Sequence, residues 1–153
     1  MSDLGDFANR IRKIAANVKD GGPKAVRQVA TVALQAVVMA TPVGNTSLWN
    51  EHSRSTARPG YVGGRARANW QVGLNSPVSG SVDDVDAAGG GTISAGIAII
   101  AGATQDGQEI HITNNLPYIV PLNEGHSHQA PAGFVELAVQ RAVTAVKDFR
   151  ITE

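Results

Sequence analysis

One long apolar segment limits how this chain can fold. After Pro23 comes "KAVRQVATVALQAVVMA", residues 24–40, which is rich in Ala and Val on nearly every side. At the period of a helix, one face holds Val26, Ala30, Ala33 and Val37, and other faces hold Val29, Val32 and Val38. A helix that is apolar all round must be covered all round. We expect a buried central helix, covered by the domain's own sheet and a loop or by a neighbouring subunit.

A second helical pattern precedes this segment. Apolar residues recur at steps of four, three and four, on one face of a helix, at Phe7, Ile11, Ile14 and Val18. The "DGGP" that follows, residues 20–23, favours a break or kink near Pro23, because proline lacks the amide donor of a helix interior. Pro42, in "TPVG", predicts the end of the helical region, since the residue before a proline is pushed out of the α conformation.

Residues 44–64 are polar and rich in Gly, Ser and Arg, and the large rings among them are Trp49 and Tyr61. Loops of this length inside a compact domain are uncommon and are usually functional. We therefore interpret 44–64 as a long loop that is a candidate contact surface.

The second half of the chain predicts a small sheet and a final helix. From Arg65 to Leu74 apolar residues alternate with polar ones, as in a strand, and Trp70 falls on the apolar side. We expect further strands at "TISAGIAII", residues 92–100, and "QEIHITN", residues 108–114, and an edge strand with two prolines at "LPYIVPLNEG", residues 116–125. A helix follows Pro131. We predict one α+β domain over residues 1–153, with a mostly antiparallel sheet and the C-terminal helix packed on it.

Charge is balanced in total but uneven along the chain. There are 13 basic and 13 acidic residues; residues 1–50 hold six basic and three acidic, 51–70 hold four and one, and 71–153 hold three and nine. This distribution suits contacts with unlike partners, although ordinary solvated faces would explain it as well.

Targeting and redox signals are few. Cysteine is absent, which excludes disulfides and thiolate metal sites. The early Asp3 and Asp6, without a continuous apolar run, do not fit a secretory signal. The longest apolar run, residues 95–103, is far shorter than the ~20 residues of a membrane span. We expect a soluble protein, without membrane contact, made and kept in the cytoplasm.

A metal-dependent hydrolase is the first chemical hypothesis. Glu124, His126 and His128 lie close together in "LNEGHSHQAPAGF", and histidine is a common metal ligand. A closed site would need further ligands, and His52 and His111 are the remaining histidines. The other reading is structural: these side chains cap the last helix or line a subunit contact. We favour the structural reading and expect no enzyme, metal or cofactor.

A nucleic-acid role is the second hypothesis. Arg54, Arg58, Arg65 and Arg67 accompany Trp49, Tyr61 and Trp70, and arginines interleaved with aromatic rings can track phosphates and stack on bases. No helix-turn-helix or zinc-finger pattern accompanies them. The alternatives are non-specific contact with passing DNA and an arginine-rich protein interface.

Three segments in order resemble one known family: "TPVG", "GGRARANWQV", and "ITNNLPYIVPLNEGHSHQAPAGFVELAVQRA". Together they resemble the tail-completion, or neck, proteins of long-tailed bacteriophages, over about Thr41 to Ala142. The family often passes almost directly from the first segment to the second, whereas here residues 45–62 intervene. The resemblance implies structural motif residues at Pro42, Gly64, Trp70, Tyr118, Gly125, Pro131 and Phe134.

The resemblance also implies a function. Such proteins are virion components without catalytic activity or cofactor, and they assemble as a ring, expected to be six-fold, between the head connector and the tail terminator or tail tube. The alternative within the same class is a tail terminator that caps the tail tube. Under either reading, the candidate subunit or partner contacts are Trp49, Arg54, Arg58, Tyr61, Arg65, Arg67, Glu124, His126 and His128.

Overall fold

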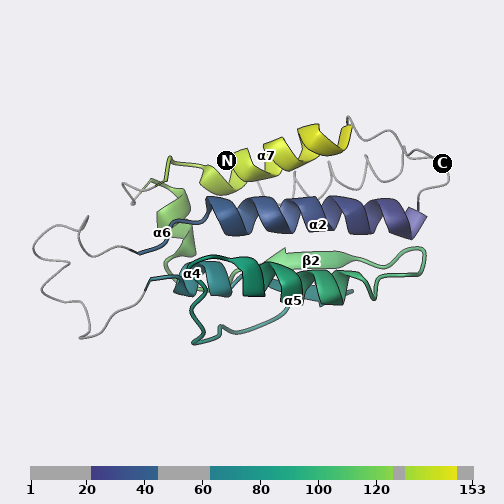
Figure 1. Cartoon of the computed structure of the whole chain (residues 1–153), viewed down its shortest axis with the longest axis horizontal. Helices are drawn as coiled ribbons and strands as arrows, with labels where there is room; N and C mark the ends of the chain where they lie inside the picture. The colour runs from purple at the N-terminus through teal and green to yellow at the C-terminus, as the bar shows by residue number, and fades with distance from the viewer. Residues whose placement is uncertain (1–21, 45–62, 126–129, 148–153) are drawn as a thin grey trace, which may run out of the picture.

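The computed structural model describes residues 22–44, 63–125 and 130–147. They confirm an α+β fold in which helices pack against a small antiparallel sheet (Figure 1). The elements in chain order are α2 (Gly22–Ala40), α4 (Arg65–Ala68), β1 (Gln71–Leu74), α5 (Gly90–Ile100), β2 (Ile110–Thr113), α6 (Ile119–Asn123) and α7 (Phe134–Lys147).

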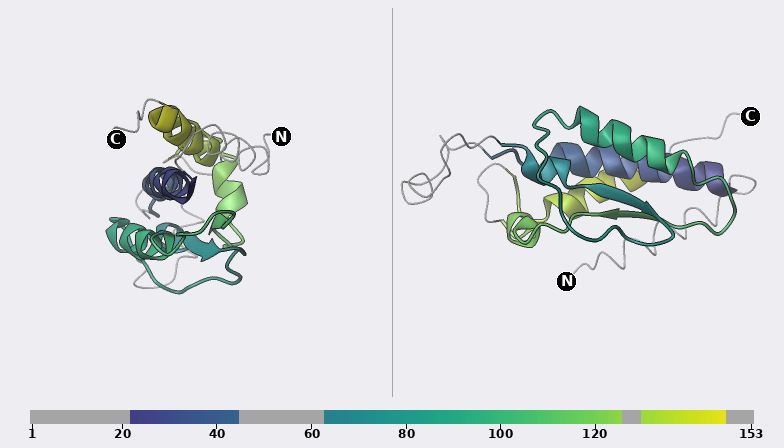
Figure 2. Two further views of the ribbon diagram at one scale, coloured as in Figure 1. Left: turned by 90° about the vertical axis from the view of Figure 1, so that its right-hand side faces the viewer. Right: turned by 90° about the horizontal axis from the view of Figure 1, so that it is seen from below.

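The central helix is α2. It lies between α7 on one side and the layer of α5 and the sheet on the other (Figures 1 and 2). Its buried residues are Ala25, Val29, Ala30, Ala33, Leu34, Val37 and Val38. The expectation that this apolar helix needs cover on most sides is confirmed, and two helices as well as the sheet provide that cover. The helix ends at Ala40, just before Pro42, and Pro23 sits in its first turn, where the missing amide costs little.

The sheet consists of β1 and β2, paired antiparallel with Gln71 opposite Thr113 and Leu74 opposite Ile110. The strand predicted at 108–114 is confirmed in β2. The strand predicted at 65–74 is right only for its last four residues, because Arg65–Ala68 form the short helix α4. Gly64, with φ 115, precedes this helix, and at its end the backbone N–H of Asn69 donates a hydrogen bond to the carbonyl of Arg65.

The strand predicted at 92–100 is wrong, since this segment lies in helix α5. A short apolar run has no period that separates a strand from a packed helix. In the structure, the buried residues Gly96 and Ile100 are four apart and face the core, while Ala95 and Ala98 are exposed. The edge strand predicted at 116–125 is also wrong. Ile119–Asn123 form helix α6, in whose first turn Pro121 needs no amide donor.

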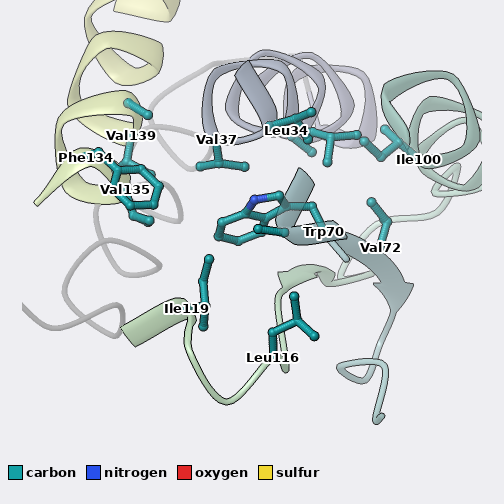
Figure 3. Packing of buried hydrophobic residues seen from close by; sticks show 14 residues of the cluster. Leu34, Val37, Trp70, Val72, Ile100, Leu116, Ile119, Phe134, Val135 and Val139 are labelled. Atoms are coloured by element: carbon teal, nitrogen blue, oxygen red, sulfur yellow. The ribbon is translucent and has the colours of Figure 1, made fainter. Parts of the chain in front are cut away.

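The core lies where α2, β1, α6 and α7 meet, with Trp70 at its centre (Figure 3). Trp70 is 8% exposed and Phe134 2%, so the prediction of Trp70 as a core residue is confirmed. Phe134 opens α7 and joins the same cluster as Trp70 and Ile119, which brings the C-terminal helix to the sheet region. Pro131 precedes α7 by three residues, so the helix predicted to follow it is confirmed. The predicted helix at 7–18 and most of the predicted 44–64 loop fall outside the described residues.

Candidate functional site

The three segments that carry the family resemblance meet at one end of the molecule, where α2 ends and α4, α6 and the start of α7 gather (Figure 1). Trp70 Nε1 donates a hydrogen bond to Thr41 Oγ1 at 2.7 Å, and Thr41 Oγ1 donates to the carbonyl of Val37 at 2.6 Å. Thr41 is fully buried. The first segment is therefore joined to the second through a buried side-chain pair.

Arg67 strengthens the same junction. Its Nε donates to Thr41 O at 2.8 Å, one terminal nitrogen donates to Met39 O at 3.1 Å, and the other donates to Ala87 O at 2.6 Å. The first two carbonyls belong to the C-terminal end of α2, where helix carbonyls lack partners and attract positive charge. Arg67 was predicted as a partner contact, and the structure binds its half-buried side chain to main-chain carbonyls of the same chain. Arg65, the other predicted contact in α4, forms an exposed ion pair with Asp83 at 3.2 Å.

Asparagine side chains tie the third segment into this cluster. Asn114 Nδ2 donates to Ala66 O at 2.9 Å, which links β2 to α4. Asn123 Oδ1 accepts from the backbone N–H of Val135 at 2.9 Å, and Asn123 Nδ2 donates to both carboxylate oxygens of Glu136 at 2.9 Å. Asn123 therefore caps the first turn of α7, a role that sequence reasoning missed.

Glycines permit two close approaches in the cluster. A Cβ on Gly64 would lie 2.6 Å from the backbone nitrogen of Ala87, and one on Gly63 would collide with the carbonyl of Gly44. Gly44 and Gly63 therefore adjoin. The chain leaves the described fold and returns to it at almost the same point, on either side of residues 45–62.

The loop between β1 and α5 is fixed by one buried and one exposed asparagine side chain. Asn69, which is fully buried, bonds the N–H and the C=O of Val82 at 2.8 and 3.0 Å. Asn115 Nδ2 bonds the carbonyls of Val78 and Gly80. This loop is long but held in place, and neither asparagine stood out in the sequence.

Asp86 ends this loop and caps α5. Its Oδ2 accepts from the backbone N–H and the hydroxyl of Thr92 at 2.7 and 2.8 Å, and its Oδ1 accepts from Gly89 N–H at 2.9 Å. The two bonds from Thr92 hold the pKa of Asp86 below its usual value, against a smaller opposing effect of burial. The carboxylate of Asp86 is thus used within the fold.

The structure tests the metal hypothesis only in part, because His52, His126 and His128 lie outside the described residues. Glu124 is exposed at the end of α6, and His111 Nε2 lies 3.0 Å from Glu109 Oε2 in an ion-pair position. Across 22–44, 63–125 and 130–147, no three His, Asp or Glu side chains form a group that could hold a metal ion. A cavity of about 110 Å³ between the start of α2 and the 105–108 turn has Asp106 as its one titratable side chain, so its lining offers no acid–base pair.

The remaining predicted site residues divide into two groups. Trp49, Arg54, Arg58 and Tyr61 lie outside the described ranges. Tyr118, which is 39% exposed, precedes α6, and Gly125 follows it with φ 99, a conformation that favours glycine. The residues that join α2, α4, α6 and the start of α7 therefore hold the fold together at one end of the molecule.

Comparisons with protein-family models, curated proteins and solved structures give no significant match for the chain. Within the part of the chain that the structure describes, no helix has the length and apolar character needed to cross a membrane.

Proposed function

We propose that this chain is a structural subunit of the neck of a tailed bacteriophage, forming a ring that joins the head connector to the tail. The observation that carries the proposal is the convergence of its three motif segments. Although they are spread from Thr41 to Ala142, the Trp70–Thr41 bond joins the first segment to the second, and the Asn114–Ala66 bond joins the third to the second. Residues that share a common structural purpose are expected to cluster in this way.

The position of residues 45–62 also supports the proposal. These residues are the departure from the family pattern, in which the first two segments almost adjoin. Because Gly44 and Gly63 are in contact, the two segments adjoin here as well. An insertion between two neighbouring points leaves the surrounding frame unchanged, and long surface insertions cost little free energy.

The polar side chains of the described residues agree with an assembly role. Asp86 caps a helix, Arg67 binds main-chain carbonyls, and Asn69, Asn114 and Asn123 bind backbone groups. These polar side chains hold the fold together. The exposed apolar side chains of Val120 and Met39 are then available for contacts between subunits.

The test is a binding experiment with separately purified head connector and tail tube from the same phage. The proposal predicts stoichiometric retention of the chain on the immobilised connector, and no retention on a connector from an unrelated phage. Binding to the tail tube alone would replace the proposal with the tail-terminator function. Binding to neither, together with a bound metal that His128→Ala removes, would favour the hydrolase.

A further inference from the structure

Two exposed flanks lie at opposite edges of the molecule. In both views of Figure 2, α5 lies at one edge, while β2 and α6 lie toward the other. The α2/α5 flank is defined by the exposed residues Lys24, Gln35, Met39, Ala98 and Ile99, and the β2/α6 flank by the exposed residues Glu109, Pro117, Tyr118, Val120 and Glu124.

Both flanks expose large apolar side chains. On the α2/α5 flank Met39 is 52% and Ile99 42% exposed, beside a helix α5 that contains no charged residue. On the β2/α6 flank Val120 is 59% and Tyr118 39% exposed. Aromatic and apolar side chains that project from a fixed element are typical anchors of protein interfaces.

The two flanks also carry opposite charge. Among the exposed residues that define them, the α2/α5 flank carries Lys24, whereas the β2/α6 flank carries Glu109 and Glu124. Two carboxylates lie beyond the ends of α2: Asp106 lies beside Gly22, and Asp86 is bound to Thr92. The charge pattern therefore favours contact between unlike flanks and disfavours contact between like ones.

The charges also match in position along the molecule. Lys24 in the first turn of α2 and Glu109 just before β2 lie at the same end of the long axis (Figure 1). Arg67 and Glu124 lie at the other end, and Arg67 donates to three uncharged main-chain carbonyls at 2.6 to 3.1 Å. Two copies placed side by side in the same direction would bring Lys24 near Glu109 and Arg67 near Glu124.

We propose that the partner of the β2/α6 flank is the α2/α5 flank of a second copy of this chain. The inference rests on the proposed function and deepens it, since it names the contact that builds the ring. A contact between two different surfaces is heterologous, and repeated head-to-tail contacts of this kind close into rings. The long axis of each subunit then runs along the axis of the ring.

Two variants, each damaging one flank, test the proposal. Val120→Asp removes the apolar anchor of the β2/α6 flank, and Met39→Asp places a carboxylate on the α2/α5 flank. Both side chains are more than half exposed, so the fold tolerates the change. We expect sedimentation velocity of each variant, measured with and without the connector, to show that its self-association constant falls by about thirtyfold or more. The control Leu137→Asp, on the outer face of α7, should assemble as the unchanged protein does.

A mixture of the two variants gives the decisive result. Val120→Asp retains an intact α2/α5 flank, and Met39→Asp retains an intact β2/α6 flank, so the mixture should form a dimer and nothing larger. Lys24→Glu and Glu109→Lys should each weaken assembly by about tenfold, and the doubly substituted chain should recover it.

The outcomes separate this inference from the function on which it rests. If the unchanged protein forms a ring but both aspartate variants form the same ring, or if their mixture stays monomeric, the flank contact is overturned and the proposed function stands. If the unchanged protein never self-associates, with or without connector, both are overturned. A circular-dichroism melt of each variant establishes that a loss of assembly comes from the surface and not from unfolding.

Discussion

The indole nitrogen of Trp70 donates a hydrogen bond to the hydroxyl of Thr41 at 2.7 Å, across 29 residues of sequence. Both residues are buried, so the bond joins the end of α2 to the start of β1 where water does not compete. This pair is the centre of the junction between the first two motif segments.

Trp70→Ala should lower the free energy of unfolding by about 3–5 kcal/mol, because it leaves a cavity among Val37, Ile119 and Phe134. Urea denaturation measures the change. A loss below about 1 kcal/mol would show that the ring does not support the core.

Thr41→Val should cost about 1–3 kcal/mol, because the buried Trp70 N–H then lacks an acceptor. Thr144→Val is the matched control: its hydroxyl also bonds the carbonyl four residues earlier, but at an exposed position, so a change within about 0.5 kcal/mol is expected. Equal effects of the two substitutions would contradict the role of the buried pair.

Arg67→Ala should destabilise the protein by about 1.5–3 kcal/mol, since three main-chain carbonyls lose a charged donor. Arg65→Ala removes an equal charge from the same short helix but breaks an exposed ion pair with Asp83, and should cost less than about 1 kcal/mol. The comparison uses urea unfolding of both variants at one ionic strength. If Arg65→Ala were the more damaging, the bonds of Arg67 to these carbonyls would not matter for stability.

Asp86→Ala tests the cap of α5 and its pH dependence. At neutral pH the loss should be about 0.5–2 kcal/mol, the usual cost of a helix cap. Because the folded pKa of Asp86 lies below the unfolded value of 3.8, its stabilisation is complete above that value and disappears as the pH falls through the folded pKa. Asp84→Ala, at an exposed position, is the control. An Asp86 effect that stays the same down to the folded pKa would contradict the account.

Gly96→Ala should destabilise by about 1–3 kcal/mol, because the added Cβ would lie 2.3 Å from a methyl group of Leu34 and 3.0 Å from one of Val72. Gly90→Ala, in the same helix, meets open space and should be neutral or stabilise by up to about 1 kcal/mol. Thermal or urea unfolding distinguishes the two. A neutral Gly96→Ala would mean that α5 does not pack closely on α2 and β1.

Removing residues 45–62 by joining Gly44 to Gly63 should leave stability within about 1 kcal/mol, since the two ends already adjoin. The matched control removes residues 76–82, which Asn69 and Asn115 hold to the fold, and should weaken it clearly. Cooperative urea unfolding of the first variant is the expected result; its failure to fold would show that 45–62 support the frame.

The sequence predicts the long helices better than the short elements. α2 and the last helix follow from apolar periodicity and from the prolines near their ends, and Trp70 follows from its place among apolar neighbours. α5, α4 and α6 were assigned as strands because runs such as "TISAGIAII" fit both periods. The helical form of α5 depends on the carboxylate of Asp86 and on close packing at Gly96, which are tertiary features, and α4 begins after the left-handed Gly64.

The candidate site was predictable as a set of segments but not as a set of contacts. The motif order pointed to Pro42, Gly64 and Trp70, and the structure bonds Trp70 to Thr41, the residue before Pro42. The roles of Asn114 and Asn123 depend on distances between residues far apart in sequence, so no local pattern announces them. Arg67 was expected at a surface because arginine usually is, and the carbonyls that bind it come from two other segments.

The measurement that tests the central claim most directly is the mass of the purified protein in solution, by sedimentation velocity over a range of concentrations, with and without the head connector. The neck-ring account predicts a discrete closed oligomer, or a monomer that becomes a stoichiometric ring on the connector. A protein that stays monomeric at every concentration and ignores the connector would contradict it.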